Sequence, residues 1–306
     1  MKPCPHLAPL GIIGVGNMGM GMALRWRSLG GQVEVHDRDA KRVQQAQAEG
    51  CTVHASPQAL AQALPDAALL IVCVVDAQQC RDVLFGTQGA AAHRPAQSVV
   101  MLCPTISPQD TESIAADLAD HGVSTIDAPM SGGPLRAAQG KMSLMVACAD
   151  PVWAQHGSTL GQLAQPIFRV GTRVGDGART KLVNNLLAGI NLVGAAEALA
   201  LAERMGLDAA TTLNVIEASS GQSWIGSDRM RRALQHDFAP RAHMTLLAKD
   251  TGLAVAAAQD LGFSGPLGAT AAATFHAATG RWSEADDAAM LEHLRQSTPA
   301  PPEANG

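Results

Sequence analysis

A glycine-rich turn between a short apolar run and a helical pattern constrains the fold of this chain more than any other feature. Gly14, Gly16 and Gly19 have the spacing G-x-G-x-x-G. In such a turn the first glycine allows the tight bend, the second lets a pyrophosphate approach the backbone, and the third lets the helix pack closely on the strand. The helix start at Asn17 and Met18 would then present backbone N–H groups to phosphates. The sequence therefore predicts a dinucleotide-binding turn.

An acidic residue follows the turn at the distance that such a site requires. Asp37 ends the second predicted strand, about twenty residues beyond the turn. A carboxylate at this point accepts the hydroxyl groups of the adenosine ribose, which favours NAD. Arg38 is the next residue, and its guanidinium could instead hold a 2′-phosphate. We expect NAD as the cofactor, with NADP as the alternative.

The order of strand-type and helix-type segments defines the fold class. The first part of the chain alternates between the two types, which is typical of a doubly wound α/β domain. We predict an α/β fold, with an N-terminal Rossmann-type doubly wound sheet in residues 1–172. The helices expected after its first two strands cover residues 18–29 and 40–49. The expected strands cover residues 10–13, 32–36, 51–54, 68–75, 98–103, 123–127, 143–147 and 167–170.

The pattern changes after about residue 171, where only helical periodicity remains. We predict an all-α domain for substrate binding and oligomerisation in residues 173–306, with ligand chemistry in the cleft between the two domains. The tail at residues 297–306 is Pro-rich and polar, and we expect it to be frayed. The predicted helices cover residues 178–205, 209–219, 227–235, 246–261, 266–279 and 286–296.

Composition excludes several classes of function. Of the 306 residues, 47% are hydrophobic, which excludes a disordered chain. The net charge of -5 argues against a nucleic-acid-binding surface, which needs a concentrated basic face. The six cysteines form no CxxC pair, and the ten histidines form no metal-binding motif, so we expect free thiols and no metal.

The expected location is the cytoplasm. The N-terminus has no long apolar segment of the kind found in a signal peptide. The longest apolar stretch contains Asn184, Asn185, Asn191 and Glu197, which favours a buried helix of a soluble protein over a membrane span.

A second candidate site lies in the loop after the strand at residues 123–127. Ser131, Gly132 and Gly133 offer a hydroxyl group and closely spaced backbone N–H groups, which could bind a carboxylate. A nucleophilic serine would need glycine at position 129, where Pro129 stands. An ordinary tight turn is the remaining alternative.

Two lysines stand out on otherwise apolar helices. Lys181 shares a helix face with Asn184 and Asn185, at i+3 and i+4. A lysine in such a place is either used by the protein or extends its ammonium group to solvent. Lys249, beside Asp250, could be functional or part of a surface ion pair.

These segments together resemble the β-hydroxyacid dehydrogenase family, which includes 3-hydroxyisobutyrate, tartronate semialdehyde and threonate enzymes. The resemblance runs over residues 10–293, and four motifs match in order. Residues 220–230, including Trp224, look most like the threonate enzymes, although Trp224 could also be a core tryptophan. The motifs are G-V-G-N-M-G at residues 14–19, D-A-P-M-S-G-G at 127–133, G-A-R-T-K-L-V-N-N at 177–185 and K-D-T-G-L-A at 249–254.

The resemblance implies a role for each matched position. Lys181 would be the catalytic acid/base, and Asn185 would hold the reacting hydroxyl group. Ser131, Gly132 and Gly133 would bind the substrate carboxylate. The remaining implied contacts are Lys249 and Trp224 with the substrate, and Lys249, Val74, Val75 and Thr105 with the cofactor. Val74 and Val75 depart from the Met-Leu-Pro sequence common in this family.

The implied function is therefore an NAD(P)-dependent dehydrogenase of a small anionic hydroxy acid or semialdehyde, assembled as a homodimer or homotetramer. A reductase of tartronate or succinic semialdehyde and an imine reductase are alternatives on the same fold. Lys181 counts against the imine reductase, because many of those enzymes replace it. A decarboxylating 6-phosphogluconate-type enzyme would need a longer helical domain. A catalytically silent nucleotide sensor is the non-enzymatic alternative.

Overall fold

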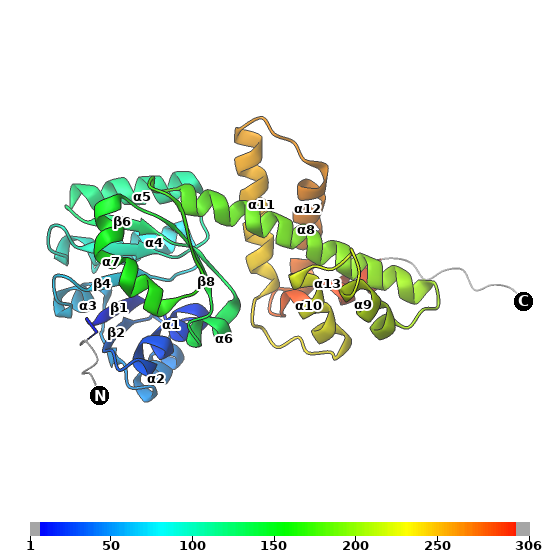
Figure 1. The fold of residues 1–306 in the computed structure, drawn as a ribbon, viewed down its shortest axis with the longest axis horizontal. Helices are drawn as coiled ribbons and strands as arrows, with labels where there is room; N and C mark the ends of the chain where they lie inside the picture. The colour runs from blue at the N-terminus through cyan, green and yellow to red at the C-terminus, as the bar shows by residue number, and fades with distance from the viewer. Residues whose placement is uncertain (1–6, 298–306) are drawn as a thin grey trace, which may run out of the picture. The chain divides into compact units, whose positions relative to one another are not determined.

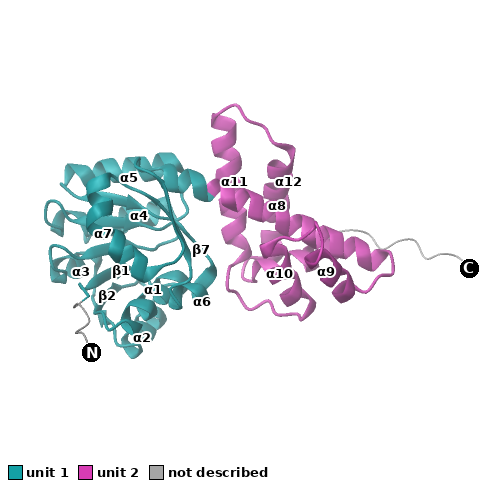
Figure 2. Cartoon of the chain, viewed as in Figure 1, with its two compact units in different colours: residues 1–181 teal, residues 182–306 magenta. Residues whose placement is uncertain are grey.

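The computed structural model describes residues 7–297. It separates into two compact units, Met1–Lys181 and Leu182–Gly306 (Figure 2). The boundary between the units falls inside one long helix. The predicted domain boundary at residue 172 lies just before that helix and stays a prediction. Most of the predicted frayed tail, residues 298–306, lies outside the described residues.

Unit 1 is a Rossmann-type domain (Figure 1). Its described residues form a nine-stranded sheet with the order β3-β2-β1-β4-β5-β6-β8-β7, and β9 pairs with β8. The strands from β3 to β6 are parallel, whereas β8 runs antiparallel to β6. The strands are β1 (Leu10–Ile13), β2 (Val33–His36), β3 (Thr52–Val53), β4 (Leu69–Val72), β5 (Val99–Leu102), β6 (Ser124–Asp127), β7 (Met130–Ser131), β8 (Ser143–Ala147) and β9 (Ile167–Gly171).

Strand β1 marks the switch point of this sheet, because β2 pairs with one of its edges and β4 with the other. Ile12 is opposite Val35 of β2 and also opposite Ile71 of β4. In open α/β sheets, ligands bind outside the carboxyl ends of the strands at such a point. The loops that follow β1, β4, β5 and β6 therefore define where a site is expected.

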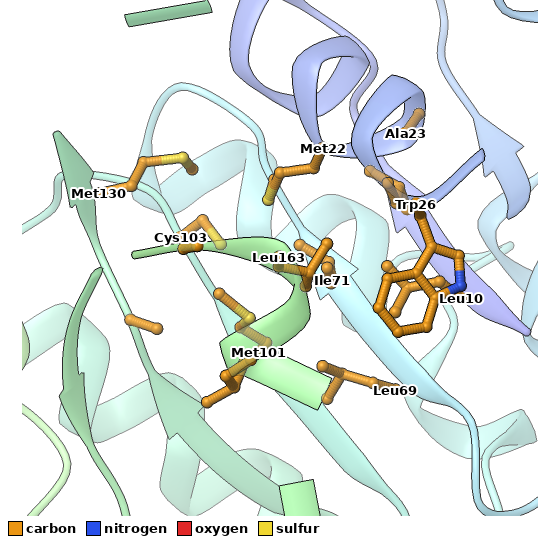
Figure 3. Close-up of a cluster of buried hydrophobic side chains, with 14 of the residues drawn as sticks. Leu10, Met22, Ala23, Trp26, Leu69, Ile71, Met101, Cys103, Met130 and Leu163 are labelled. Atoms are coloured by element: carbon orange, nitrogen blue, oxygen red, sulfur yellow. The ribbon is translucent and has the colours of Figure 1, made fainter. Parts of the chain in front are cut away.

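Both faces of the sheet are buried, as continuous apolar strands predict. On one face, Leu10, Ile71 and Met101 pack with Trp26 from the helix after β1 (Figure 3). A separate core on the opposite face includes residues from the same strands. The helices of unit 1 are α1 (Asn17–Ser28), α2 (Ala40–Ala48), α3 (Pro57–Ala63), α4 (Ala77–Phe85), η1 (Ala91–His93), α5 (Pro108–Asp120), α6 (Gly133–Ala138) and α7 (Asp150–Leu163).

In its described residues, unit 2 consists of helices joined by loops, with one isolated β-bridge between His243 and Asp286. A buried ion pair, in which Arg232 Nη1 donates to Asp286 Oδ1 at 2.9 Å, lies beside its apolar core. Asp286 Oδ2 also accepts from the backbone N–H of Arg241 and of Ala242, so this carboxylate joins two connecting segments. The helices are α8 (Asp176–Arg204), α9 (Ala209–Glu217), α10 (Trp224–Leu234), α11 (Met244–Asp260), α12 (Pro266–Trp282), η2 (Asp287–Ala289) and α13 (Met290–Ser297), of which α8 begins in unit 1.

The predicted fold class is confirmed, and all eight predicted strands are present within a few residues of their expected ends. Strand β7, a two-residue strand in the loop at residues 127–133, was not predicted. Helix α10 begins three residues earlier than predicted, because Ser223 Oγ accepts from Gly226 N and caps it. The five described cysteines are free thiols, as expected, and Cys4 lies outside the described residues.

One helix, α8, is long and apolar enough to cross a membrane by length and composition alone. The core helix of a soluble protein passes the same test. Of its most apolar window, 44% is buried within the protein. Its buried Asn185 is a polar group that a lipid environment would disfavour.

Candidate active site

The glycine turn between β1 and α1 has the backbone geometry that its sequence predicts. Gly14 has φ +93°, and a Cβ there would lie 2.6 Å from the carbonyl oxygen of Cys73. A Cβ at Gly19 would lie 2.0 Å from the carbonyl oxygen of Gly14. No atom lies within 4 Å of the corresponding point at Gly16. Gly14 and Gly19 are therefore required by the fold itself, whereas Gly16 faces open space.

The start of α1 fits the diphosphate of a dinucleotide. Gly16 is the N-cap residue, no side chain caps this helix end, and its first turn contains no acidic residue. The start of this helix and the positive end of its dipole therefore favour the binding of an anion. Asn17 and Met18, two of the predicted contacts, form this first turn.

The carboxylate of Asp37 ties the end of β2 to the glycine turn. Its Oδ2 accepts from Val15 N at 2.8 Å, and its Oδ1 accepts from Asp39 N at 2.9 Å. These bonds fix the carboxylate beside the turn while each oxygen keeps a further lone pair for a ligand hydroxyl. Arg38 is exposed at the same strand end.

The other predicted cofactor contacts follow neighbouring parallel strands. Val74 is half-buried and Val75 is 50% exposed, two and three residues after β4. Thr105 is half-buried, three residues after β5. Because β1, β4 and β5 are parallel, these residues lie at the same edge of the sheet as the glycine turn.

The predicted carboxylate-binding loop forms the short strand β7 and then turns into α6. Met130 and Ser131 pair with β8, and Ser131 is half-buried. Gly132 and Gly133 have φ values of 123° and 75°, which a residue with a side chain rarely adopts. Their consecutive unusual conformations direct the backbone from β7 into α6, which begins at Gly133.

Lys181 lies against this loop and is not a solvent-directed lysine. It is only 7% exposed, and its Nζ donates to the carbonyl oxygen of Met130 at 2.7 Å. The helix-surface interpretation of Lys181 is therefore wrong. Its ammonium group is next to the backbone of Ser131, within unit 1.

Unit 2 contains a second group of predicted site residues, which we call the amide cluster: Asn184, Asn185, Lys249 and Asp250. Asn185 Nδ2 donates to Asp250 Oδ2 at 2.6 Å, and Asn184 Nδ2 donates to Asn185 Oδ1 at 3.0 Å. Lys249 Nζ lies 3.1 Å from Asp250 Oδ1. Asp250 is 6% exposed, so its pair with Lys249 is not a surface ion pair. Asn185 stands one helical turn after Lys181 along α8.

Trp224 begins α10 and is 56% exposed, so its interpretation as a core residue is wrong. It is not part of the amide cluster. Among the described residues, no group of three or more His, Cys, Asp or Glu side chains could hold a metal ion.

Comparison with known proteins decides the family. Residues 9–171 match the family described as the NAD binding domain of 6-phosphogluconate dehydrogenase, and residues 175–294 match the one described as NAD-binding of NADP-dependent 3-hydroxyisobutyrate dehydrogenase. An L-threonate dehydrogenase of Escherichia coli K12 is 34% identical over 285 residues, or 92% of this chain and 93% of that protein. The chain belongs to the β-hydroxyacid dehydrogenase family. The resemblance inferred from the four motifs is thereby confirmed.

Two further members of the β-hydroxyacid dehydrogenase family support the assignment. A 3-hydroxyisobutyrate dehydrogenase of Pseudomonas aeruginosa is 31% identical over 94% of this chain and 98% of its own. The crystal structure of a 3-hydroxyisobutyrate dehydrogenase from Salmonella typhimurium has a TM-score of 0.86 and 33% identity, and covers 94% of this chain and 99% of that one. As a β-hydroxyacid dehydrogenase, this protein is an NAD(P)-binding oxidoreductase.

Sequence reasoning gave no role to two buried carboxylates that this β-hydroxyacid dehydrogenase places beside predicted site residues. Asp250 contacts Asn185, as described above. Asp127, at the end of β6, is 2% exposed and accepts hydrogen bonds from the start of α8. Their positions in the sequence could have indicated a role, because Asp127 begins the motif that contains Ser131 and Asp250 follows Lys249 in another motif. A carboxylate in an apolar setting must have partners.

Proposed function

We propose that this protein oxidises the carbinol of a small hydroxy acid to the corresponding carbonyl compound, and that L-threonate or a chemically similar polyhydroxy acid is its substrate. In this reaction the carbinol C–H bond breaks, and its electron pair leaves with the hydrogen as hydride. The hydroxyl proton goes to the neutral amine of Lys181, and a C=O bond forms. When bound, NAD(P) accepts the hydride at its nicotinamide ring.

The buried position of Lys181 is the observation that carries this proposal. An amine held 2.7 Å from the Met130 carbonyl oxygen lies next to the loop that could bind a substrate carboxylate. A general acid/base must be within hydrogen-bond reach of the proton that it transfers. Asn185, one helical turn further along, would orient the reacting hydroxyl group, and Asp250 holds its amide nitrogen. Lys249 and Trp224 remain proposed contacts of the substrate, and Lys249 also of the cofactor.

A panel of substrates tests the proposal. L-Threonate, 3-hydroxyisobutyrate, other C3–C5 hydroxy acids and the matching semialdehydes are each assayed with NAD and with NADP. We expect turnover of polyhydroxy acids with kcat/KM above that of 3-hydroxyisobutyrate. A preference for cyclic imines over every hydroxy acid and semialdehyde would contradict the proposal.

We predict that the enzyme prefers NAD because of Asp37. Its carboxylate is fixed beside the glycine turn, where it would accept ribose hydroxyl groups and repel a 2′-phosphate. Asp37→Asn removes the charge and should reduce the ratio of kcat/KM for NAD over NADP by about tenfold, equivalent to about 1.4 kcal/mol. A native enzyme that prefers NADP would contradict this prediction and would direct attention to Arg38.

We also predict that Ser131→Ala raises KM for the hydroxy acid by about 10–100-fold. A hydrogen bond to a charged group contributes about 1.5–3 kcal/mol, which corresponds to this range. Ser158→Ala is the control, because Ser158 is an exposed serine of α7 in the same unit, and it should leave KM unchanged. Equal activity on the uncharged amide of the best substrate would show that no carboxylate is bound there.

We propose a cytoplasmic homodimer or homotetramer. Three large apolar side chains share one face of α8, Val183, Leu187 and Leu201, and Met205 follows the helix directly; all four are 53–71% exposed. Apolar patches of this kind mark protein interfaces, and a second copy of the chain is the proposed partner. Leu201→Glu should shift the mass measured by light scattering toward that of the monomer. A native protein that is monomeric at micromolar concentration would contradict this proposal.

A further inference from the structure

Asp127 joins the end of strand β6 to the start of helix α8. Its Oδ2 accepts from Gly175 N at 2.8 Å and from Ala178 N at 3.1 Å, so a side chain from a distant strand caps the helix. A carboxylate at a helix N-terminus is favoured by both the unsatisfied N–H groups and the helix dipole. The contact is tight, because a Cβ at Gly177 would lie 2.8 Å from Asp127 Oδ1.

The same two segments are joined a second time by Lys181. Its Nζ donates to the carbonyl oxygen of Met130, three residues after Asp127. Lys181 itself stands about one turn beyond the capped end of α8. The strand, the loop and the first turns of the helix therefore form one hydrogen-bonded arrangement, with Asp127 at one end and the ammonium group of Lys181 at the other.

We propose that Asp127 is a positioning residue that sets the place of Lys181 beside the Ser131 loop by holding the first turn of α8 against β6. The inference rests on the proposed role of Lys181 as the acid/base. Asp127 does not touch the substrate. It acts through the helix backbone, which transmits a displacement of the capped turn to the lysine one turn away.

Protonation of Asp127 gives this arrangement a dependence on pH. Burial raises the pKa of Asp127 to about 6, and the nearby Asp176 raises it further. Hydrogen bonds from the backbone of Ala178, Gly175 and Gly177 act in the opposite direction and lower it. Charged or titratable side chains on the elements around it include Lys181 and Arg179 of α8, Glu112 of α5, which pairs with Arg179, and Cys103 after β5. Helix α5 also carries Asp110, Asp117 and Asp120, and helix α7 carries Asp150 and His156. Below about pH 6 the carboxyl group is neutral and its hydrogen bonds to the helix lose their charge assistance.

Protonation of Asp127 changes the free energy of unfolding in a direction that distinguishes a local loss of activity from unfolding of the protein. The pKa of Asp127 in the folded protein is above its ordinary value of 3.8. Between these two values the folded state binds the proton more tightly than the unfolded state, so this group adds to stability as the pH falls. A loss of activity near pH 6 caused by Asp127 is therefore expected without a loss of thermal stability from the same group.

The first test is the pH dependence of kcat for carbonyl reduction. In this direction Lys181 must be protonated to donate its proton, so its own ionisation lowers kcat only on the alkaline side of the profile. We expect a decline of kcat in the native enzyme below about pH 6. Asp127→Asn should lower kcat at pH 7.5 by about 10–100-fold, because about 1.5–3 kcal/mol of charge-assisted hydrogen bonding is lost. The variant should also show no decline of kcat below about pH 6. The control is Asp208→Asn, which removes the charge from a side-chain helix cap of the same kind on α9 and should leave the pH profile unchanged.

The second test needs no turnover and no cofactor. Acetic anhydride acylates accessible amines, and peptide mass spectrometry gives the relative rate at each lysine. Lys181 should react about tenfold faster in Asp127→Asn than in the native protein, because a loosened α8 start exposes a residue that is 7% exposed. The exposed Lys141 should react equally in both proteins. Gly177→Ala, whose methyl group would collide with the carboxylate, should have the same effect and replaces Asp127→Asn if that variant does not fold.

The outcomes distinguish the positioning role of Asp127 from the proposed catalytic role of Lys181. Unchanged labelling of Lys181 together with a retained decline near pH 6 would overturn the positioning role of Asp127. A uniform loss of activity at every pH that follows a lowered Tm would overturn it as well. Faster labelling of Lys181 in Asp127→Asn, with normal turnover in Lys181→Ala, would support the structural link and refute the proposed function of the lysine instead.

Discussion

Lys181→Ala is expected to lower kcat by about 10²–10⁴-fold, the usual contribution of a general acid/base. The amine lies against the carbonyl oxygen of Met130, and the next residue, Ser131, begins the proposed carboxylate site. With alanine, no group in that position can take the hydroxyl proton during oxidation. Affinity for the cofactor should persist, because the glycine turn that fits its diphosphate is a separate part of unit 1.

Two further variants control for the buried position of Lys181. Lys181→Met keeps most of the side-chain volume and removes the ammonium group, so it should lose as much turnover as alanine without opening a cavity. Lys141→Ala changes an exposed lysine of the same unit and should leave turnover unchanged, with stability within about 0.5 kcal/mol of native. Near-normal turnover in folded Lys181→Met would assign the acid/base role elsewhere, with Lys249 as the next candidate.

Gly16→Ala is expected to weaken NAD(P) binding by about 100-fold and to leave Tm unchanged. A Cβ at this position meets no protein atom within 4 Å, and the residue has φ -63°, which alanine adopts without strain. The methyl group would instead occupy space that a diphosphate needs to reach the N–H groups of α1. The loss of one or two charge-assisted hydrogen bonds, at about 1.5–3 kcal/mol each, gives this magnitude.

The control for Gly16→Ala is Gly161→Ala in helix α7 of the same unit. A Cβ there also meets no atom within 4 Å, and its position is remote in sequence from the turn. Cofactor titration by fluorescence and a thermal melt on each variant separate binding from folding. Native affinity in Gly16→Ala would show that the cofactor diphosphate does not approach the turn at that residue.

The fold could be predicted in detail because its determinants are local. The spacing of Gly14, Gly16 and Gly19 after an apolar run requires a strand, a tight turn and a helix in that order. Apolar segments such as Leu69–Val72 are buried on both faces and therefore read as continuous runs. Strand β7 could not be predicted, because Met130–Ser131 is held by pairing with β8 and carries no pattern of its own.

The site residues were predicted in position, but their partners were not. Lys181 was equally compatible with a solvent-directed side chain, since sequence does not show that Met130 presents a carbonyl oxygen to it. The capping of α8 by Asp127 joins residues 48 and 51 positions apart, which no sequence period reveals. Asp250 illustrates the same limit, because its partner Asn185 is 65 residues away.

Transfer of isotope from substrate to cofactor tests the central claim most directly. The best hydroxy acid of the substrate panel is prepared with deuterium on its carbinol carbon and incubated with the native enzyme and the oxidised cofactor. We predict one deuterium in the nicotinamide ring of each reduced cofactor for every carbonyl product formed, and almost no transfer in Lys181→Met. Reduced cofactor without deuterium, or equal transfer in Lys181→Met, would contradict the account.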